Sequence, residues 1–472
     1  MQMYVAGNWL DSRHTTPVKA PFSGEVIDTV PVAGRDHVEA ALAAAEKGAR
    51  AMAQLTGYER NVILERAARL LAERLEDFAR TISLEEGKPL TEARGEVSRM
   101  PDLLRLCAFE GTQIRGETLP LDAHVGAHGK LGMTLRVPCG IVVAITPFNY
   151  PVLLVLHKVG PALAAGNAVI LKPAERTPLS ALKLTKLLLE AGLPENGIQC
   201  VSGKGSEIGP QLCADSRVRK ISFTGSTDVG EAIAKVAGVK RLSLELGSNS
   251  PLVVLDDADL EKVAAATAIG GYVNAGQVCI STQRILVDRS AYSDFLDALK
   301  PRVETIKVGD PLKEDSKLSA MISETEAERV ESWVTEAISQ GARIVTGGAR
   351  SGAVYAPTVV ADVQPQMRIS RDELFGPAVA VTPVETFQQA LELANDSRYG
   401  LSAGIFTRDV TKALRFARAV ESGNVMINWT PLWRADLMPY GGFKNSGIGK
   451  EGPRYAVEEM TESKTVIFHD VE

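Results

Sequence analysis

The fold class is clearest from the part of the chain that begins with Gly140-Ile141-Val142-Val143-Ala144-Ile145. This apolar, β-branched run predicts a buried strand, and similar runs follow it in alternation with leucine- and alanine-rich stretches. The predicted strands are residues 140–145, 168–171, 198–201, 218–223 and 242–244, and the predicted helices are residues 153–165, 178–191, 206–214 and 227–237. Apolar strands separated by helices are typical of a parallel sheet covered on both faces.

The same alternation starts again after Leu246 and ends near Trp433. In this part the predicted strands are residues 251–255 and 284–287, and the predicted helices are residues 260–275, 292–299, 324–340 and 386–395. The sequence therefore predicts an α/β protein with two Rossmann-like, doubly wound parallel-sheet units.

Long helices and two separate β segments lie outside these units. Helical periodicity covers residues 35–55, 58–82 and 90–111, the last interrupted near Pro101. Residues 117–137 contain apolar stretches separated by prolines and glycines, which predicts a projecting hairpin. Residues 464–469 are a strand candidate with no partner near it in sequence. Because such a terminal strand often completes the sheet of another subunit, we expect a homodimer or homotetramer.

Composition and charge exclude several classes of function. The chain has 472 residues, of which 45% are hydrophobic and 5% aromatic, and its formal net charge is −6. A mildly acidic chain lacks the basic face that nucleic-acid binding requires. The most apolar stretch, residues 140–155, is broken by prolines and falls short of the ~20 residues of a membrane span. The first ten residues lack a basic region followed by an apolar run, so we expect no signal peptide.

The cysteines and histidines favour a reduced protein without a structural metal. Six scattered histidines form no H-E-x-x-H pattern, and no two cysteines form a C-x-x-C pair. The five cysteines are Cys107, Cys139, Cys200, Cys213 and Cys279. We therefore expect neither a disulfide framework nor a metal site, and a cytoplasmic location.

Three loops that follow predicted strands carry groups suited to a dinucleotide. The loop Phe223–Gly230 places Gly225 and Ser226 before a helix, although its G-x-x-x-x-G spacing is a weak signal alone. In the second loop, Lys172 can donate to ribose or phosphate oxygens, whereas Glu175 would accept from a 2′-hydroxyl and repel a 2′-phosphate, which favours NAD. The third loop contains Gly205. Each loop alone also fits a plain turn, but three in strand order favour a cofactor site.

Three residues combine into a candidate reactive group. Cys279 follows a helical stretch among small and polar residues, which suits a reactive thiol but also a small buried side chain. Glu245 ends an apolar strand, where burial would raise its pKa towards that of a general base unless it forms a structural salt bridge. Asn149 lies between Pro147 and Pro151, which restrict the loop and hold the Asn149 side-chain amide in place. A fixed amide N–H can donate a hydrogen bond to an oxyanion, or it can satisfy the backbone of the turn.

With these motifs in place, the chain resembles the NAD(P)-dependent aldehyde dehydrogenases over nearly its full length. The distance from Glu245 to Cys279 is 34 residues, as in that family. The motifs occur in the family's order and are Pro147-Phe148-Asn149, Lys172-Pro173-x-Glu175, Phe223-Thr224-Gly225-Ser226-x-x-x-Gly230, Glu245-Leu246-Gly247, Gly276-Gln277-Val278-Cys279, Glu373-Leu374-Phe375-Gly376-Pro377 and Pro439-Tyr440-Gly441-Gly442-x-Lys444-x-Ser446-Gly447.

The resemblance implies a mechanism of covalent catalysis without a metal. The Cys279 thiolate would attack the aldehyde, the Asn149 amide and the Cys279 N–H would hold the oxyanion, and Glu245 would activate the water that hydrolyses the thioester. The implied cofactor-binding residues are Thr146, Pro147, Lys172, Glu175, Gly205, Gly225, Ser226, Gly247, Glu373 and Phe375. Two departures matter: Ser248 replaces the family's second glycine, and Lys204 lies where a 2′-phosphate could sit, so NADP use stays open.

The resemblance also implies three structural parts. A cofactor-binding domain would comprise residues 1–116 and 138–246, and a catalytic domain residues 247–440. An oligomerisation flap would comprise residues 117–137 and 455–472.

The substrate is less well defined by the sequence. His157 follows Asn149 by about two helical turns, so it could line the same pocket. The resemblance places Arg105 on a helix that flanks the family's substrate tunnel and Arg434 just before the family's closing loop. The Arg434-x-Asp436-x-Met438-Pro439 pattern resembles lactaldehyde, succinic semialdehyde and non-phosphorylating phosphoglyceraldehyde dehydrogenases. Arginines near a small pocket suggest a short aldehyde with a hydroxyl or anionic group. The alternative is that Arg105 and Arg434 form structural ion pairs. The family members that act on phosphonoacetaldehyde carry an arginine just before the cysteine, so Val278 at that position counts against this substrate.

Two other functions fit the same motifs. A CoA-acylating dehydrogenase would use CoA instead of water, but such members usually lack the base that Glu245 supplies. A catalytically silent scaffold of the same fold would not need Cys279, Glu245 and Asn149 together.

Overall fold

The apolar run at Gly140 forms the centre of an eight-stranded sheet in the computed structural model, which describes residues 1–470. The strand order is β2-β1-β9-β8-β7-β10-β11-β21, and the five strands from β9 to β11 are parallel to their neighbours. The strands are β1 (Met3–Val5), β2 (Asn8–Leu10), β7 (Ile141–Ile145), β8 (Ala168–Lys172), β9 (Ile198–Cys200), β10 (Val218–Thr224), β11 (Arg241–Glu245) and β21 (Gly447–Ile448).

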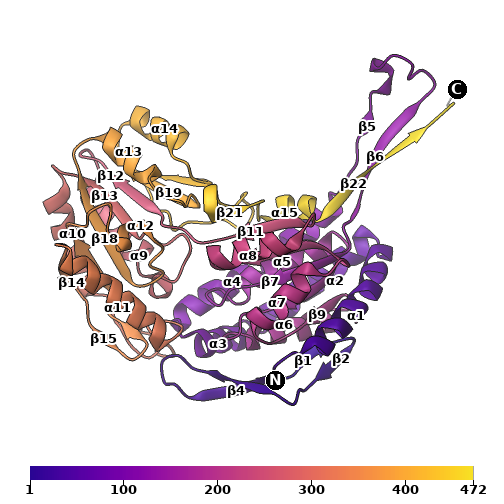
Figure 1. The fold of residues 1–472 in the computed structure, drawn as a ribbon, viewed down its shortest axis with the longest axis horizontal. Helices are drawn as coiled ribbons and strands as arrows, with labels where there is room; N and C mark the ends of the chain where they lie inside the picture. The colour runs from indigo at the N-terminus through magenta and orange to yellow at the C-terminus, as the bar shows by residue number, and fades with distance from the viewer. Residues whose placement is uncertain (471–472) are drawn as a thin grey trace.

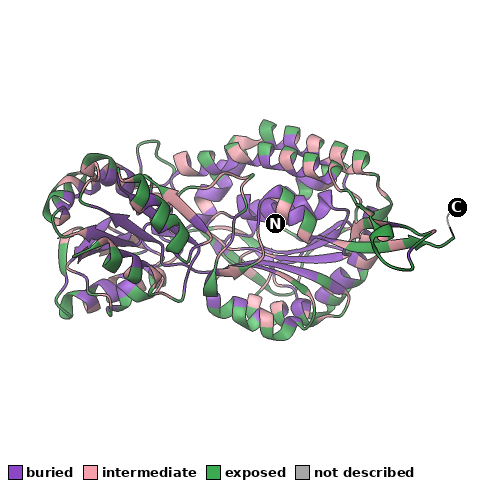
Figure 2. Ribbon diagram, turned by 90° about the horizontal axis from the view of Figure 1, so that it is seen from above, coloured by how far each residue is buried: buried purple, intermediate pink, exposed green. Residues whose placement is uncertain are grey.

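Helices cover both faces of this sheet because its strands are apolar on both sides. Val142 and Ala144 of β7 pack into the core beneath α4, α5 and α6, whereas Ile141 and Val143 pack against α1, α7 and α8. Figure 2 shows the buried strands between layers of helices whose outer sides are exposed. These helices are α1 (Arg35–Gln54), α4 (Leu90–Thr112), α5 (Leu153–Ala164), α6 (Leu179–Glu190), α7 (Gly205–Ala214) and α8 (Thr227–Ala237).

The second α/β unit contains a seven-stranded sheet in the order β14-β17-β18-β13-β12-β19-β20, parallel except for β14. The two units lie side by side in Figure 1. The strands are β12 (Pro251–Val254), β13 (Arg284–Asp288), β14 (Arg343–Thr346), β17 (Thr358–Ala361), β18 (Ala378–Val384), β19 (Ser402–Phe406) and β20 (Asn424–Ile427). The helices are α9 (Leu260–Gly270), α10 (Tyr292–Glu304), α11 (Glu324–Ser339), α12 (Arg368–Arg371), α13 (Phe387–Asn395) and α14 (Val410–Ala419).

The predicted hairpin is a flap that projects from the first unit and carries the C-terminal strand (Figure 1). It contains β5 (Thr118–Leu119), η1 (Leu121–Ala123), β6 (Leu131–Pro138) and β22 (Thr461–Phe468). The tail strand has a partner in its own chain, since β22 pairs with β6 from Thr461↔Pro138 to Phe468↔Leu131. A partner strand in another subunit is therefore not needed to explain this strand. The last two residues of the predicted flap, 471–472, lie outside the described residues.

Three predicted helices differ in detail. The helix predicted at 58–82 is two helices, α2 (Gly57–Glu73) and α3 (Leu75–Glu86), divided at Arg74, whose guanidinium bonds Glu190 at 2.6 and 2.8 Å. Helix α4 continues across Pro101. The helix predicted at 260–275 ends at Gly270.

The remaining elements are short. They are β3 (Thr15–Lys19), β4 (Val26–Pro31), β15 (Arg350–Ser351), β16 (Val354–Tyr355), α15 (Pro453–Glu459), η2 (Val273–Gly276) and η3 (Lys444–Ser446). Within residues 1–470, no helix combines the length and the apolar character needed to cross a membrane.

Candidate active site

Cys279 follows a tight backbone turn between α9 and β13. Asn274 and Ala275 in η2 both have φ of +52°, a conformation that costs free energy in residues with a Cβ. Gly276 follows at φ +69°, and a Cβ there would lie 2.1 Å from the Gly376 carbonyl oxygen, so only glycine fits. The turn is held from α4, because the Asn274 N–H donates to Glu92 at 2.8 Å.

The Cys279 thiol lines a cavity of about 230 Å³ between the two units. Its Sγ lies 3.2 Å from the Tyr440 hydroxyl. Burial, with the nearby carboxyls of Glu373 and Glu245, raises the pKa of the Cys279 thiol to about 12. The lining residues are Arg99, Asn149, Tyr150, Leu153, Leu154, His157, Val278, Cys279, Ile280, Leu432, Trp433, Arg434 and Tyr440.

Asn149 lies at the wall of the same cavity, at the end of β7. Its side-chain Nδ2 donates to the Gln277 carbonyl at 2.7 Å, which leaves a second N–H of the amide available. The Asn149 main-chain carbonyl accepts from Lys88 Nζ at 2.6 Å and from Asn274 Nδ2 at 3.0 Å. The Asn149 loop and the turn before Cys279 are thus bonded to each other.

Glu245 ends β11 and is 3% exposed. Neither carboxyl oxygen has a hydrogen-bond partner among the described residues. Burial and the charge of Glu451 raise the pKa of Glu245 well above its usual range. Gly441 covers this carboxyl so closely that a Cβ there would lie 2.9 Å from Oε1. Glu245 therefore lies next to the cavity but does not line it.

Arg434 and His157, which line the cavity, belong to a chain of charged and polar groups that extends from its wall. The Arg434 guanidinium donates to His157 Nδ1 at 3.0 Å and to Glu451 at 3.1 Å. Since Nδ1 accepts, His157 is neutral and donates from Nε2 to Asp436 at 3.1 Å. Burial and the Arg434 charge lower the pKa of His157 to about 4. Asp436 also binds Arg99 at 2.5 Å.

The structure does not bring Arg105 to the cavity. It forms ion pairs with Asp102 at 2.7 Å and Glu65 at 3.8 Å on the surface of α4. Arg99, on the same helix, lines the cavity instead. Arg99 and Arg105 both lie three or four residues from buried positions of α4, so helical periodicity does not distinguish them, and the packing of the helix decides which one lines the cavity. Tyr440 stands in a quoted motif, but its contact with Cys279 was not predicted, and the buried pair Lys158–Glu451, at 2.7 Å, carried no signal in the sequence.

The predicted cofactor residues gather where the parallel strands of the first sheet end. Thr146, Lys172 and Gly225 follow or end β7, β8 and β10, which is the edge where ligands bind in such sheets. The Gly205 N–H donates to Glu175 at 2.6 Å, and Ser226 precedes α8. Pro147 lies beside Thr146 in the loop after β7. Lys204 instead pairs with Glu207 at 3.1 Å.

Glu373 and Phe375 reach this edge from the second unit. Glu373 accepts from the Ser248 N–H at 2.8 Å, and burial raises its pKa to about 7. A Cβ on Gly247 would lie 2.5 Å from the Glu373 carboxyl, so the two segments meet closely. Phe375 has φ of +49° and its ring meets that of Phe148 edge-on at 6.0 Å.

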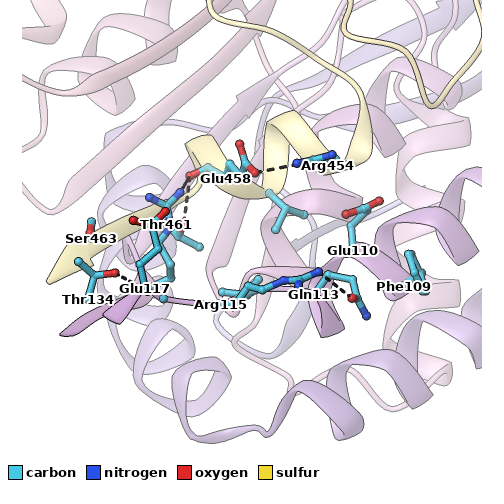
Figure 3. Close-up of a pocket in the computed structure, with 14 residues that line it drawn as sticks. Phe109, Glu110, Gln113, Arg115, Glu117, Thr134, Arg454, Glu458, Thr461 and Ser463 are labelled. Atoms are coloured by element: carbon cyan, nitrogen blue, oxygen red, sulfur yellow. Dashed lines mark hydrogen bonds and ion pairs between the residues drawn. The ribbon is translucent and has the colours of Figure 1, made fainter. Parts of the chain in front are cut away.

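A larger cavity, of about 820 Å³, lies at the base of the flap (Figure 3). Residues of α4, the flap, α15 and β22 line it. In this cavity the main-chain carbonyl of Glu458 accepts from the Arg136 guanidinium at 2.6 Å, and the Glu458 carboxylate forms an ion pair with Arg454 at 3.7 Å. None of the predicted site residues lines this cavity.

Comparisons with known proteins agree with the fold and the motifs. The sequence profile of the aldehyde dehydrogenase family matches residues 9–466. The chain is 45% identical over 467 residues to a 3-sulfolactaldehyde dehydrogenase of Priestia megaterium, covering 99% of this chain and 98% of that protein.

Two solved structures are also similar. The succinate complex of aldehyde dehydrogenase 21 from Physcomitrella patens is 37% identical, with a TM-score of 0.96 over 100% of this chain and 98% of that one. The NADP complex of the glyceraldehyde-3-phosphate dehydrogenase GapN from Methanocaldococcus jannaschii is 38% identical, with a TM-score of 0.93 over 96% of this chain and 99% of that one.

The fold is therefore that of an α/β oxidoreductase with two parallel-sheet units. The chain belongs to the aldehyde dehydrogenase family, as its motifs predicted.

Proposed function

We propose that this enzyme oxidises a short, anionic aldehyde to its carboxylic acid with NAD(P), and that Cys279 is the nucleophile. The proposal rests mainly on one observation: Cys279 shares a cavity of about 230 Å³ with Asn149 and two arginines, Arg99 and Arg434. That volume is below the roughly 300–1,000 Å³ of typical small-molecule pockets, which favours a substrate of a few carbons.

In the first half of the reaction, Cys279 Sγ adds to the aldehyde carbon and the carbonyl oxygen becomes an oxyanion. The second N–H of the Asn149 amide and the Cys279 N–H are the donors that would hold this oxyanion. The bonds of Lys88 and Asn274 to the Asn149 carbonyl hold the loop in place, so that the donor needs little reorganisation.

The residues at the sheet edge fit a nicotinamide dinucleotide. The buried Thr146 Oγ1 has no hydrogen-bond partner among residues 1–470, and the Thr146 N–H donates to the Lys172 carbonyl at 3.2 Å. Lys172 and Glu175, in the loop after β8, offer a donor and an acceptor at the same sheet edge. When bound at this edge, NAD(P) would supply the hydride acceptor that oxidation of the Cys279 adduct to a thioester requires. Glu175 favours NAD, because its carboxylate would repel a 2′-phosphate, while Lys204 nearby leaves NADP open.

In the second half, Glu245 takes a proton from a water that attacks the thioester, and the acid leaves as Cys279 is released. A carboxyl with a raised pKa is a stronger base once it is deprotonated. Its two unpartnered oxygens are free to bind that water. The alternative reaction, transfer of the acyl group to CoA, would not need Glu245 to activate water.

The charges around the cavity favour an anionic substrate. Within residues 1–470, the ion pairs of Arg99, Arg434 and Lys158 involve two carboxylates, those of Asp436 and Glu451. Glu245, with its raised pKa, adds no full negative charge while it is protonated. A carboxylate, phosphate or sulfonate on the substrate would balance the remaining positive charge. The sulfolactaldehyde dehydrogenase and the succinate complex described above act on or hold molecules of this kind.

The three predicted parts are included in the proposal. Residues 1–116 and 138–246 would bind the cofactor, residues 247–440 would carry the nucleophile, and residues 117–137 and 455–472 would form an oligomerisation flap. The outer edge of β22 has no strand partner in the described residues, which supports a homodimer or homotetramer. A nucleophilic thiol must stay reduced, which supports a cytoplasmic location.

Turnover assays test the proposal. NADH or NADPH formation would be followed with 3-sulfolactaldehyde, glyceraldehyde 3-phosphate, succinic semialdehyde and neutral lactaldehyde, with and without CoA. We expect kcat/KM for at least one anionic aldehyde to exceed that for lactaldehyde about tenfold or more, with no need for CoA. Cys279→Ala should abolish turnover. Equal rates for neutral and anionic aldehydes would contradict the substrate class, and no turnover on any aldehyde would favour a silent scaffold.

A further inference from the structure

Tyr440 lies against the thiol that the proposed function makes the nucleophile. Its hydroxyl oxygen is 3.2 Å from Cys279 Sγ, and the residue is 2% exposed. Two main-chain hydrogen bonds with Glu451, of 3.1 and 2.7 Å, fix the backbone of Tyr440. The Arg434 guanidinium lies 3.9 Å from the centre of its ring. The phenol is therefore held in place from three sides.

The surroundings of Cys279 otherwise oppose a thiolate. Burial and the carboxyls of Glu373 and Glu245 disfavour the negative charge, while Arg434 and Tyr440 favour it. Among the described residues these four groups act on the thiol most strongly, and the side chains of Arg99, Tyr150 and His157 line the same cavity. Among the described residues, Tyr440 is the only one whose polar side-chain atom forms a hydrogen bond with Sγ.

We propose that Tyr440 is a further catalytic residue: its hydroxyl donates a hydrogen bond to the Cys279 thiolate and holds Sγ towards the aldehyde carbon. The proposal rests on the proposed function, because it assigns a partner to the nucleophile named there.

The electrostatics of the phenol fit this role. Burial and the neighbouring Cys279 raise the pKa of Tyr440 well above its usual range, so the hydroxyl keeps its proton. A protonated phenol beside a thiolate can only donate. Arg434 above the ring makes the O–H more polar without a direct bond to sulfur. The charge on sulfur is thereby stabilised by a neutral donor, which does not compete with an anionic substrate for Arg434.

The test measures the thiol itself, without substrate. The rate of Cys279 alkylation by iodoacetamide would be followed by mass spectrometry between about pH 6.5 and 9.5 in the full-length chain and in Tyr440→Phe. Loss of a hydrogen bond to a charged acceptor should raise the thiol pKa by about one unit. The more basic thiolate is also a better nucleophile, which offsets part of the effect. We therefore expect alkylation to be about threefold to tenfold slower at each pH.

Tyr455→Phe on α15 is the matched control, because Tyr455 lies outside the Cys279 cavity and does not contact the thiol. Its alkylation profile should match that of the unaltered chain. An unchanged or faster rate in Tyr440→Phe would overturn the proposal, since the hydroxyl would then accept from the thiol or do nothing.

Two further measurements separate the possible failures. If Tyr440→Phe does not fold, 3-fluorotyrosine would replace Tyr440 instead. It keeps the ring and the hydroxyl, and its more acidic hydroxyl is a stronger hydrogen-bond donor, so alkylation of Cys279 should become faster. A slower or equal rate would overturn the proposal. Full turnover in Cys279→Ala would instead overturn the proposed function. An inactive Cys279→Ala together with unchanged alkylation in Tyr440→Phe would overturn only the role of Tyr440.

Discussion

Glu245 and Glu451 are two buried carboxyls whose pKa values are shifted in opposite directions. Although burial opposes ionisation in both, Lys158 at 2.7 Å and Arg434 at 3.1 Å lower the pKa of Glu451. Within residues 1–470, Glu245 forms no hydrogen bond with a cation, and the charge of Glu451 adds to the burial that raises its pKa. One carboxyl thus stays ionised and structural, and the other is left able to exchange a proton.

Glu245→Gln should separate the two halves of the reaction. The amide cannot take a proton from water, so thioester hydrolysis should slow and kcat should fall about 10²–10⁴-fold. Acylation does not need this group, so about one NADH per subunit should form in a rapid burst, visible by stopped-flow absorbance. Cys279→Ala, as a control, should give no burst. A large loss of kcat in Glu245→Gln without a burst would mean that Glu245 acts before the thioester forms.

Glu451→Gln should destabilise the fold. It leaves the charges of Lys158 and Arg434 buried without their carboxylate, which costs about 3–5 kcal/mol of unfolding free energy. The loss would be measured by urea unfolding at neutral pH. Glu458→Gln is the control, because the exposed Glu458 carboxylate forms only an ion pair of 3.7 Å with Arg454 within α15, and it should change stability by less than about 0.5 kcal/mol. Equal stability of the two variants would show that Glu451 does not compensate these cations.

His157 should make stability depend on pH. In the unfolded chain its pKa is close to 6.5, and in the folded protein burial and Arg434 lower it to about 4. Between these values the unfolded chain binds more protons, so stability falls as pH drops from 6.5 towards 4. At pH 5 the loss from this group should be about 2 kcal/mol, at about 1.4 kcal/mol per pKa unit.

The measurement is urea unfolding at pH 7.5 and pH 5 in the unaltered chain and in His157→Gln. The glutamine amide keeps a donor towards Asp436 but has no proton to gain, so its loss between the two pH values should be smaller. His14→Gln, at an exposed position, is the control and should keep the original slope. The same slope in all three proteins would mean that His157 already binds a proton in the fold.

Arg99 and Arg105 offer a matched pair on one helix. Arg99→Gln removes a cation from the cavity wall, so KM for an anionic aldehyde should rise about tenfold while KM for lactaldehyde changes little. Arg105→Gln alters only surface ion pairs with Asp102 and Glu65 and should change neither value. Steady-state assays on both substrates check this. A larger rise in KM for the anionic aldehyde in Arg105→Gln than in Arg99→Gln would instead support Arg105, the residue predicted from the sequence, as the substrate-binding arginine.

Local sequence pattern was sufficient to predict the α/β class. Strand β7 is apolar at every position and β8 at every position before Lys172, which is a property of the sequence itself. The motifs around Asn149 and Glu245 lie at strand ends that the same pattern predicts, and the motif around Cys279 follows a predicted helix. The motif order was likewise enough to indicate the family. These features depend on residues that are neighbours in the chain.

The contacts between distant segments depended on the tertiary structure. Which arginine of α4 faces the cavity depends on how that helix packs on α5, and the contact of Tyr440 with Cys279 joins residues 161 apart in sequence. The pairing of β22 with β6, and of Lys158 with Glu451, also joins residues about 300 apart. Periodicity describes one element at a time, so it predicts which side of a helix or strand is buried but not which side chain it meets there.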